Sequence, residues 1–218
     1  MFEEALDREG FFFCIIRKMQ GKFIVFEGPD GSGQSTQARF LKDYLERKGY
    51  SVLLTKEPTT ESEAGKKIAE VLKGKAIADP AELQELFVED RNAHLENTIL
   101  PALAKGKIVI SDRYFFSTIA FGSLECDKEW LIQINKEFPL PDVAFILEVS
   151  PEVCVKRINK RGKGVQFFEK AEKLRRVLEA YKELPSRFPN VHMVNGEQSI
   201  RGVFRIICER TDRLLSQQ

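Results

Sequence analysis

Short apolar runs alternate along the chain with longer segments whose apolar residues recur at helical spacing. Runs of about four to eight apolar residues are typical of buried strands, whereas apolar positions three and four apart indicate one face of a helix. This alternation predicts an α/β fold whose parallel sheet is covered by helices on both faces. The predicted strands are 22–27, 51–55, 108–111, 143–149 and 191–194, and the predicted helices are 35–48, one opening at Pro80 and running towards Leu103 with a bend at Pro101, one from Pro151, 168–184 and 200–215.

A glycine-rich segment joins the first strand to the first helix. Gly28, Gly33 and Ser35 match the phosphate-binding pattern G-x-x-x-x-G-K-[ST], but Gln34 takes the place of the lysine. A strand, a glycine turn and a helix N-terminus together aim backbone N–H groups at a phosphate, and Ser35 is placed to ligate Mg²⁺. Gln34 can donate hydrogen bonds but carries no charge to the β- and γ-phosphates. The alternative, a glycine turn without a ligand, disagrees with the flanking strand and helix.

Length and charge limit the function classes. A chain of 218 residues suits one α/β domain, and a formal net charge of +1 argues against a protein that coats nucleic acid. The four cysteines show no C-x-x-C spacing and indicate reduced thiols in a cytosolic protein. No apolar run approaches the length that spans a membrane. We therefore expect a cytoplasmic protein with small anionic ligands and with neither nucleic acid nor membrane as a partner.

The domain pattern covers residues 22–218, which we expect to form a single domain. Residues 1–21 are an extension of uncertain status. Residues 10–16 are apolar and follow acidic residues, so they lack the leading positive charge of a secretory signal. Either Met19 is the initiator and the earlier residues belong to an over-extended reading frame, or the segment forms an edge strand or a partner-binding arm.

Polar residues lie where predicted strands end. Glu57, Asp112 and Asn195 follow their strands directly, and ligands of open parallel sheets bind at the carboxyl ends of the strands. An acid in this position is suited to hold Mg²⁺ directly or through water, so we expect Asp112 to do so. The alternative is that Asp112 only caps the next helix, although a cap and a metal ligand are compatible roles.

Phe87 and Arg91 lie four positions apart on the predicted helix from Pro80, so they project from one side. An aromatic ring offers a stacking surface for a base, and a guanidinium one turn away can bond a base carbonyl or a phosphate. Taken alone, the same spacing also fits a core aromatic beside a solvated arginine.

Four motifs together resemble those of the thymidylate kinase family. They are residues 23–33, the T-K-E-P of 55–58, the L-F-V-E-D-R of 86–91, and the D-R-Y-F-F-S-T-I-A-F of 112–121, which is the most specific. The resemblance runs from about residue 22 to the C-terminus. It implies a P-loop NTPase fold, a three-layer α/β/α sandwich with a five-stranded parallel sheet and a short lid, at about 160–169. It also implies phosphorylation of dTMP to dTDP with MgATP, in a protein that is a homodimer like most of the family.

The resemblance also implies residue roles at the acceptor site. Phe87 would stack on thymine, Arg91 would bond its O4 edge and Thr118 would read the base edge. Phe121 would crowd the 2′ position and so favour deoxyribose. The residues expected to bind the dTMP phosphate and sugar, or to complete this site, are Arg113, Lys56 where the family usually has Arg, Asp30 at the 3′-hydroxyl, Glu57 and Ser117.

The donor site departs from the family pattern. Gln34 replaces the P-loop lysine, and Gly31 stands where one branch of the family carries an arginine. The lid lacks the D-R pair of many family members, yet it is basic, with Lys160, Arg161 and Lys163 following Arg157 on the preceding helix. Because phosphoryl transfer depends on cations around the moving phosphate, we expect Arg161 to be catalytic together with Asp30 and Arg113. The ATP-binding residues are expected to be Gly28, Gly31, Ser32, Gly33, Gln34, Ser35, Thr36 and Arg157.

Alternatives to this hypothesis follow from the same departures. The basic lid could be a solvated loop without a role. The chain could act on another pyrimidine nucleoside monophosphate, or it could be a catalytically weak nucleotide-binding module that regulates. His94 and His192 are expected to be structural.

Overall fold

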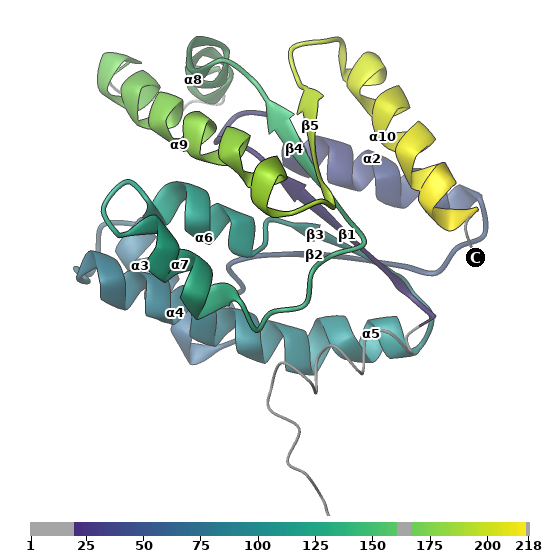
Figure 1. The fold of residues 1–218 in the computed structure, drawn as a ribbon, viewed down its shortest axis with the longest axis horizontal. Coiled ribbons are helices and arrows are strands. Elements are labelled where there is room, and N and C mark those ends of the chain that lie inside the picture. Colours follow the sequence, from purple (N-terminus) through teal and green to yellow (C-terminus); the bar gives the residue numbers. More distant parts are fainter. Residues whose placement is uncertain (1–19, 161–166, 217–218) are drawn as a thin grey trace, which may run out of the picture.

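The computed structural model describes residues 20–160 and 167–216 of the chain, with side chains from 167 to 169 left aside. Five parallel strands form one sheet in the order β2-β3-β1-β4-β5, and helices cover both faces (Figure 1). The predicted three-layer α/β/α fold is therefore confirmed. The expectations for residues 1–19 and for Arg161 and Lys163 lie outside the described residues. The strands are β1 (Lys22–Glu27), β2 (Val52–Lys56), β3 (Ile108–Asp112), β4 (Val143–Glu148) and β5 (Val191–Asn195).

The strands consist of apolar residues because both faces of the sheet are buried. Along β1, Phe23 and Val25 point to one face, and Ile24 and Phe26 point to the other. Helices α2 and α10 cover the second face, while α5, α6, α7 and α9 pack against the first (Figure 1). The helices are α2 (Gln34–Arg47), α3 (Glu63–Leu72), α4 (Pro80–His94), the π-helical segment η1 (Leu95–Ile99), α5 (Leu100–Ala104), α6 (Phe115–Gly122), α7 (Lys128–Asn135), α8 (Pro151–Asn159), α9 (Phe167–Arg187) and α10 (Ile200–Leu215).

The helix that begins at Pro80 contains a π-helical segment, η1. Asp79 caps the N-terminus of α4 by accepting from the backbone N–H of Ala81. Helix α4 then continues through η1 into α5, with helical backbone angles at both junctions. The sequence predicted a bend at Pro101. The structure instead shows π-helical turns just before it, where the proline ring would otherwise crowd the carbonyl four residues earlier.

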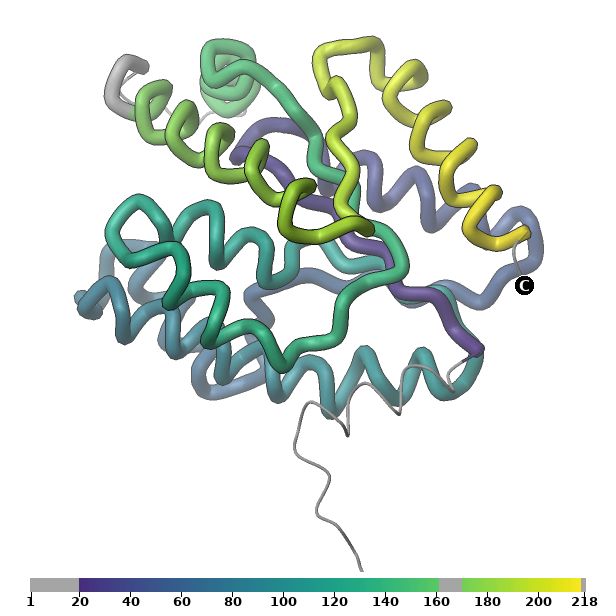
Figure 2. Tube along the Cα trace, viewed as in Figure 1, coloured from purple at the N-terminus to yellow at the C-terminus, as the bar shows by residue number. Residues whose placement is uncertain are grey.

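The strand register brings polar residues to one edge of the sheet. Asp112 is the partner of Phe26 on β1 and of Lys56 on β2. The carboxyl ends of these strands therefore meet where the glycine-rich loop leaves β1. The chain trace shows α10 returning alongside α2, where Tyr44 donates to Asp212 over 2.7 Å (Figure 2). Within residues 20–160 and 167–216, no helix has the length and apolar character needed to cross a membrane.

Candidate active site

The glycine-rich loop wraps tightly between β1 and α2. Gly28 has φ +144°, and a Cβ there would lie 2.9 Å from the Leu147 carbonyl oxygen. Gly31 has φ +87°, and a Cβ there would lie 2.7 Å from the Cys154 carbonyl oxygen. A larger residue at either position would be strained, so the arginine that one family branch carries at position 31 does not fit this loop.

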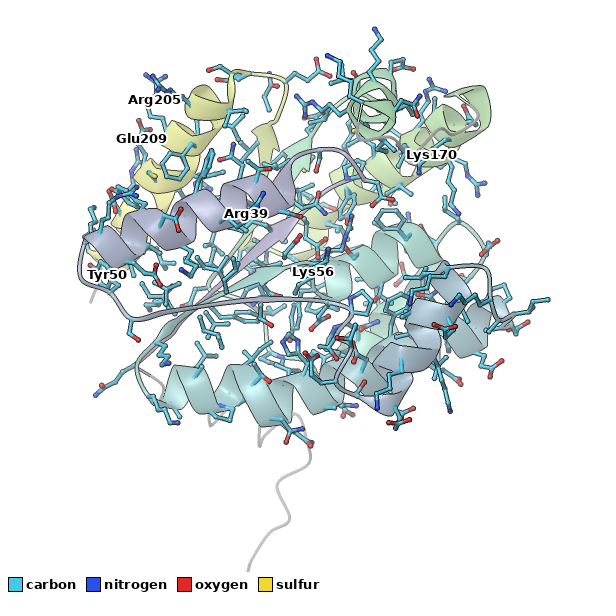
Figure 3. All side chains as sticks on the ribbon, turned by 180° about the vertical axis from the view of Figure 1, so that it is seen from behind. Arg39, Tyr50, Lys56, Lys170, Arg205 and Glu209 are labelled. Atoms are coloured by element: carbon cyan, nitrogen blue, oxygen red, sulfur yellow. The ribbon has the colours of Figure 1, made fainter. Side chains whose placement is uncertain are left out.

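A cavity of about 270 Å³ opens in front of the loop. The N-terminus of α2 faces it, which favours an anion. Lys56, at the end of β2, and Lys170, on α9, contribute positive charge from two sides of the same cavity (Figure 3). The other residues that line it are Asp30, Gly31, Gly33, Gln34, Ser35, Thr36, Arg113 and Ile158.

Ser35 lines this cavity and contacts Asp112, the last residue of β3. The Ser35 hydroxyl donates to Oδ2 of Asp112 over 2.5 Å, and Lys56 Nζ lies 3.8 Å from the same oxygen. Within the described part of the chain, Oδ1 of Asp112 is buried and has no hydrogen-bond partner. A carboxylate oxygen without a protein partner beside a hydroxyl suits Mg²⁺.

No group of three or more His, Cys, Asp or Glu side chains gathers as a metal site in residues 20–160 and 167–216. Mg²⁺ does not require one, because it usually keeps several waters and binds one or two carboxylates together with substrate phosphates. The residues present therefore fit a nucleotide-bound Mg²⁺ rather than a resident metal centre.

Gln34 does not extend into this cavity as a free side chain. It is only 5% exposed, and its carboxamide lies between the hydroxyl of Ser32 and the guanidinium of Arg113. With the amide nitrogen towards Ser32, the amide oxygen accepts from Nη2 and Nε of Arg113 over 2.8 and 3.2 Å. The reverse orientation would set N–H groups against N–H groups, so hydrogen bonding decides the assignment.

Arg113 follows β3 in a left-handed backbone conformation, with φ +80°. Such a conformation in a non-glycine residue costs on the order of 1–3 kcal/mol and persists where the surroundings hold it. The backbone N–H donates to Phe26, and the guanidinium donates to Asp30 Oδ1 over 2.8 Å and to Ser117 Oγ over 2.9 Å. The guanidinium carbon also lies 5.0 Å from the centre of the Phe121 ring.

A second cavity, of about 310 Å³, lies on the other side of Arg113 and Asp30, which line both cavities. Phe87 forms part of its wall and Arg91 part of its base. The remaining lining residues include Glu57, Pro58, Leu72, Leu83, Gln84, Tyr114, Ser117, Thr118, Phe121, Leu124, Glu125 and Lys173. The cavity is thus bounded by aromatic and aliphatic residues together with polar and charged groups, which suits a small molecule with both an apolar and a polar part.

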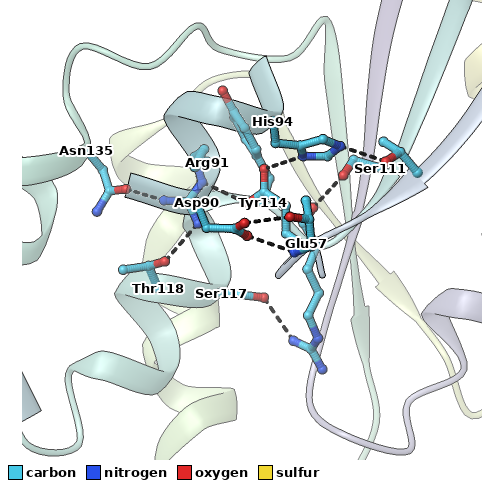
Figure 4. A network of polar contacts seen from close by, with 12 residues as sticks. Glu57, Asp90, Arg91, His94, Ser111, Tyr114, Ser117, Thr118 and Asn135 are labelled. Atoms are coloured by element: carbon cyan, nitrogen blue, oxygen red, sulfur yellow. Dashed lines mark hydrogen bonds and ion pairs between the residues drawn. The ribbon is translucent and has the colours of Figure 1, made fainter. Parts of the chain in front are cut away.

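The Arg91 guanidinium is buried and held from three sides (Figure 4). It donates from Nε to Glu57 Oε2 over 2.8 Å, from Nη1 to Asn135 Oδ1 over 2.6 Å and from Nη2 to Thr118 Oγ1 over 3.0 Å. His94 contacts the other oxygen of Glu57 at 3.2 Å. A guanidinium has five N–H donors, so two remain for a ligand after these three bonds.

The sequence analysis assigned no role to two residues that support the site, Asn135 and Glu27. Asn135, on α7, orients Arg91 from a helix that the sequence pattern did not reveal. Glu27, at the end of β1, is fully buried and accepts from the Ser117 hydroxyl over 2.5 Å and from the Tyr181 hydroxyl over 2.8 Å. The sequence signal that could have identified Glu27 as a site residue was its position at the end of a predicted strand, directly before the glycine-rich loop.

Burial raises the pKa of Glu27 to about 7, although the nearby Arg113 guanidinium and the hydrogen bonds from Ser117 and Tyr181 lower it. Tyr181 belongs to α9, the helix that follows the predicted lid. Glu27 therefore links that helix to the residues that hold Arg113.

The structure brings most of the predicted site residues to these two cavities, but Arg157 lies elsewhere. Its guanidinium donates to the backbone carbonyls of Ser32 over 2.9 Å and Gly196 over 3.2 Å, behind the loop. Gly28, Ser32 and Asp112 line neither of these two cavities, and Arg161 lies outside the described residues.

The chain is similar in sequence to proteins of one known family. A family model described as thymidylate kinase matches residues 26–207. A probable thymidylate kinase of Pyrococcus horikoshii is 42% identical over 191 residues, which cover 85% of this chain and 93% of that protein. A thymidylate kinase of Desulfotalea psychrophila is 40% identical over 197 residues, covering 89% and 96%. One of Caldicellulosiruptor saccharolyticus is 35% identical over 212 residues, covering 92% and 100%.

Proposed function

Because this chain belongs to the thymidylate kinase family, we propose that it transfers the terminal phosphoryl group of ATP to dTMP and so forms dTDP and ADP. The observation that carries the proposal is the meeting of two cavities at Arg113 and Asp30. One cavity has a helix N-terminus and a phosphate-binding loop, and the other has aromatic walls and a buried guanidinium. A phosphate donor and a nucleoside monophosphate can therefore face each other across one arginine.

On the donor side, the loop and the N-terminus of α2 bind the phosphates of ATP through backbone N–H groups. Ser35 and Asp112 would hold Mg²⁺, directly or through water, and the ion would supply positive charge beside the β- and γ-phosphates. The unpartnered Oδ1 of Asp112 supports this assignment. Arg157 supports the loop from behind, on the side where Gly196 lies.

On the acceptor side, Phe87 stacks on the base, and the two free N–H groups of Arg91 bond the base carbonyl. Glu57, Thr118 and Asn135 fix the guanidinium in the plane that this contact needs. A guanidinium only donates, so a pyrimidine with a carbonyl at position 4 is favoured over one with an amino group there. Phe121 closes the wall beside the sugar.

At the boundary, Arg113 holds the dTMP phosphate with help from Lys56, and Asp30 orients the sugar and Arg113. The bond between the γ-phosphorus and its bridging oxygen breaks, and a phosphate oxygen of dTMP forms the new bond. Cations stabilise the charge on the transferred group, and Arg161 from the lid is proposed to be one of them.

The test is an ADP-release assay with ATP, Mg²⁺ and each of dTMP, dUMP, dCMP and dGMP. We expect turnover with dTMP and much less with dCMP and dGMP. Preference for dUMP would move the assignment to another pyrimidine kinase. Turnover with none of the four, combined with normal ATP binding, would favour the regulatory nucleotide-binding module.

Three further points stay predictions: that residues 22–218 are one domain, that the protein is a homodimer and that it is cytoplasmic. Gel filtration with light scattering measures the second directly.

A further inference from the structure

We propose that Gln34 is a positioning residue, whose side chain holds the Arg113 guanidinium at the boundary between the ATP and dTMP cavities. Held there, Arg113 contributes on the donor side the positive charge that a P-loop lysine would bring. This inference rests on the proposed transfer from ATP to dTMP.

Geometry is the first support. The Gln34 amide oxygen accepts from Nη2 and Nε of Arg113 over 2.8 and 3.2 Å, while its amide nitrogen faces the Ser32 hydroxyl. Although Gln34 lines the first cavity, the residue is only 5% exposed and its carboxamide is engaged in this contact. The side chain at the lysine position of the loop thus ends at a guanidinium.

Charge is the second support. An amide oxygen can accept from a guanidinium, whereas a lysine ammonium has donors only and would repel it at this distance when no phosphate lies between them. Asp30 holds the guanidinium from another side, at 2.8 Å. Gln34 and Asp30 together leave Arg113 cationic and fixed in direction.

Rigidity distinguishes Arg113 from other cations of the donor cavity. Lys56 and Lys170 also line it, but the Lys56 side chain is 62% exposed and lies 3.8 Å from Asp112. The Arg113 side chain is 14% exposed and has Gln34, Asp30 and Ser117 as partners. A charge that is already in place needs no reorganisation when the transferred group develops its own charge.

The experiment compares Gln34→Met with Gln37→Met by steady-state kinetics in both substrates. Methionine keeps the length of the side chain and removes the acceptor. Gln37 is the matched control, because it lies one turn further along α2 and its amide donates to the Ile200 carbonyl instead. We expect Gln34→Met to lower kcat/KM for dTMP roughly 10–100-fold, the range for a lost hydrogen bond to a charged group. KM for ATP should change far less, and Gln37→Met should leave both unchanged.

A double-mutant cycle with Arg113→Lys measures the coupling. We expect the two losses to be strongly non-additive, because either change alone removes the Gln34–Arg113 contact. Additive losses, or a Gln34→Met effect confined to KM for ATP, would overturn the inference. Equal losses in Gln34→Met and Gln37→Met would reduce the effect to general helix damage and also overturn it.

Gln34→Lys gives a second variant that retains a long side chain at the start of α2. If Gln34 positions Arg113, this variant should raise KM for dTMP. A higher kcat with an unchanged KM for dTMP would instead show that the donor site only lacks the positive charge of a lysine, and that Gln34 has no positioning role. Calorimetric dTMP titrations of the same variants test the contact without turnover. Absence of turnover by the unmodified protein would contradict the proposed function. Unchanged dTMP affinity in Gln34→Met would contradict the positioning role alone.

Discussion

The Ser35 hydroxyl donates to Asp112 Oδ2 over 2.5 Å, which joins the first turn of α2 to the end of β3 across 77 positions of sequence. The contact uses one carboxylate oxygen and leaves Oδ1 without a partner in the described part of the protein. Because an unsatisfied buried oxygen is costly in a purely structural acid, this arrangement favours a carboxylate that serves a ligand.

Asp112→Asn should therefore lower Mg²⁺-dependent turnover by about 100-fold or more, since a metal ion supplies several kcal/mol of charge stabilisation. The melting temperature should change little, because asparagine can still accept from Ser35. Asp43→Asn, on the exposed side of α2, is the control. Near-normal Mg²⁺-dependent activity of Asp112→Asn would remove Asp112 from the metal site.

Phe87→Ala should weaken dTMP binding by about 1–3 kcal/mol, the range for a base stacked on an aromatic ring. The affinity for ATP should stay nearly constant, since Phe87 lines only the second of the two cavities. Calorimetric titration with each nucleotide measures both. Equal losses for the two nucleotides would make Phe87 a core residue.

Asn135→Leu should raise the dissociation constant for dTMP about 10-fold or more, because it leaves an Arg91 N–H without its acceptor and frees the guanidinium to turn. The discrimination between dTMP and dCMP should fall as well. Asn97→Leu, on the exposed side of η1, is the control. If the discrimination between dTMP and dCMP is unchanged while stability drops, Asn135 contributes to core packing and does not orient Arg91 towards the base.

Glu27 should make stability depend on pH. Its pKa rises from an ordinary value of 4.5 to about 7 on burial, so the native protein holds this proton more tightly than the unfolded chain. The contribution is complete below about pH 4.5 and is lost as the pH rises through 7. Glu27→Gln keeps a neutral group there at every pH.

The free energy of unfolding of the unmodified protein minus that of Glu27→Gln should accordingly decrease between pH 5 and pH 8. Urea unfolding of both proteins across this range measures it, with Glu89→Gln on the exposed side of α4 as the control. A difference that stays constant across this range would mean that Glu27 is ionised throughout.

Arg161→Ala should reduce turnover roughly 10³-fold or more if the lid arginine contacts the transferred phosphoryl group. Binding of dTMP should persist, since other residues, Phe87, Arg91 and Arg113, are proposed to bind it. Arg205→Ala, on the exposed face of α10, is the control (Figure 3). Full activity of Arg161→Ala would mean that the lid has no catalytic role. Arg113 and Lys56 would then supply the positive charge for the transfer.

Much of the fold could be predicted, because buried parallel strands are continuous apolar runs and glycine-containing turns mark element boundaries. Glu57 and Asp112, at or just after strand ends, then located the site, since the carboxyl edge of the sheet is common to all strands. Asn195, the third residue of this kind, lines neither of the two cavities. Helices α3 and α7 were missed, because each is short and follows a loop with mixed polar residues.

Individual contacts could not be predicted in the same way. The Arg91–Asn135 bond needs the packing of α7 against α4, and the Gln34–Arg113 bond needs the segments that follow the carboxyl ends of β1 and β3 to meet. Such pairs depend on three-dimensional orientation, about which periodicity carries no information. Arg157 is a further example, because its bonds to the backbone carbonyls of Ser32 and Gly196 could not be read from the sequence, whereas its contact with ATP stays a prediction.

The π-helical segment Leu95–Ile99 acts as a phase shift within one continuous helix. A π turn amounts to one residue inserted into an α-helix, and each residue corresponds to about 100° of rotation. Before the insertion, Phe87 and Arg91 face the second cavity, and after it Leu103 packs under the sheet. Removing a single residue there would keep a helix throughout and turn the two halves against each other. The number of residues in this segment therefore helps to set the direction of the residues that face the second cavity.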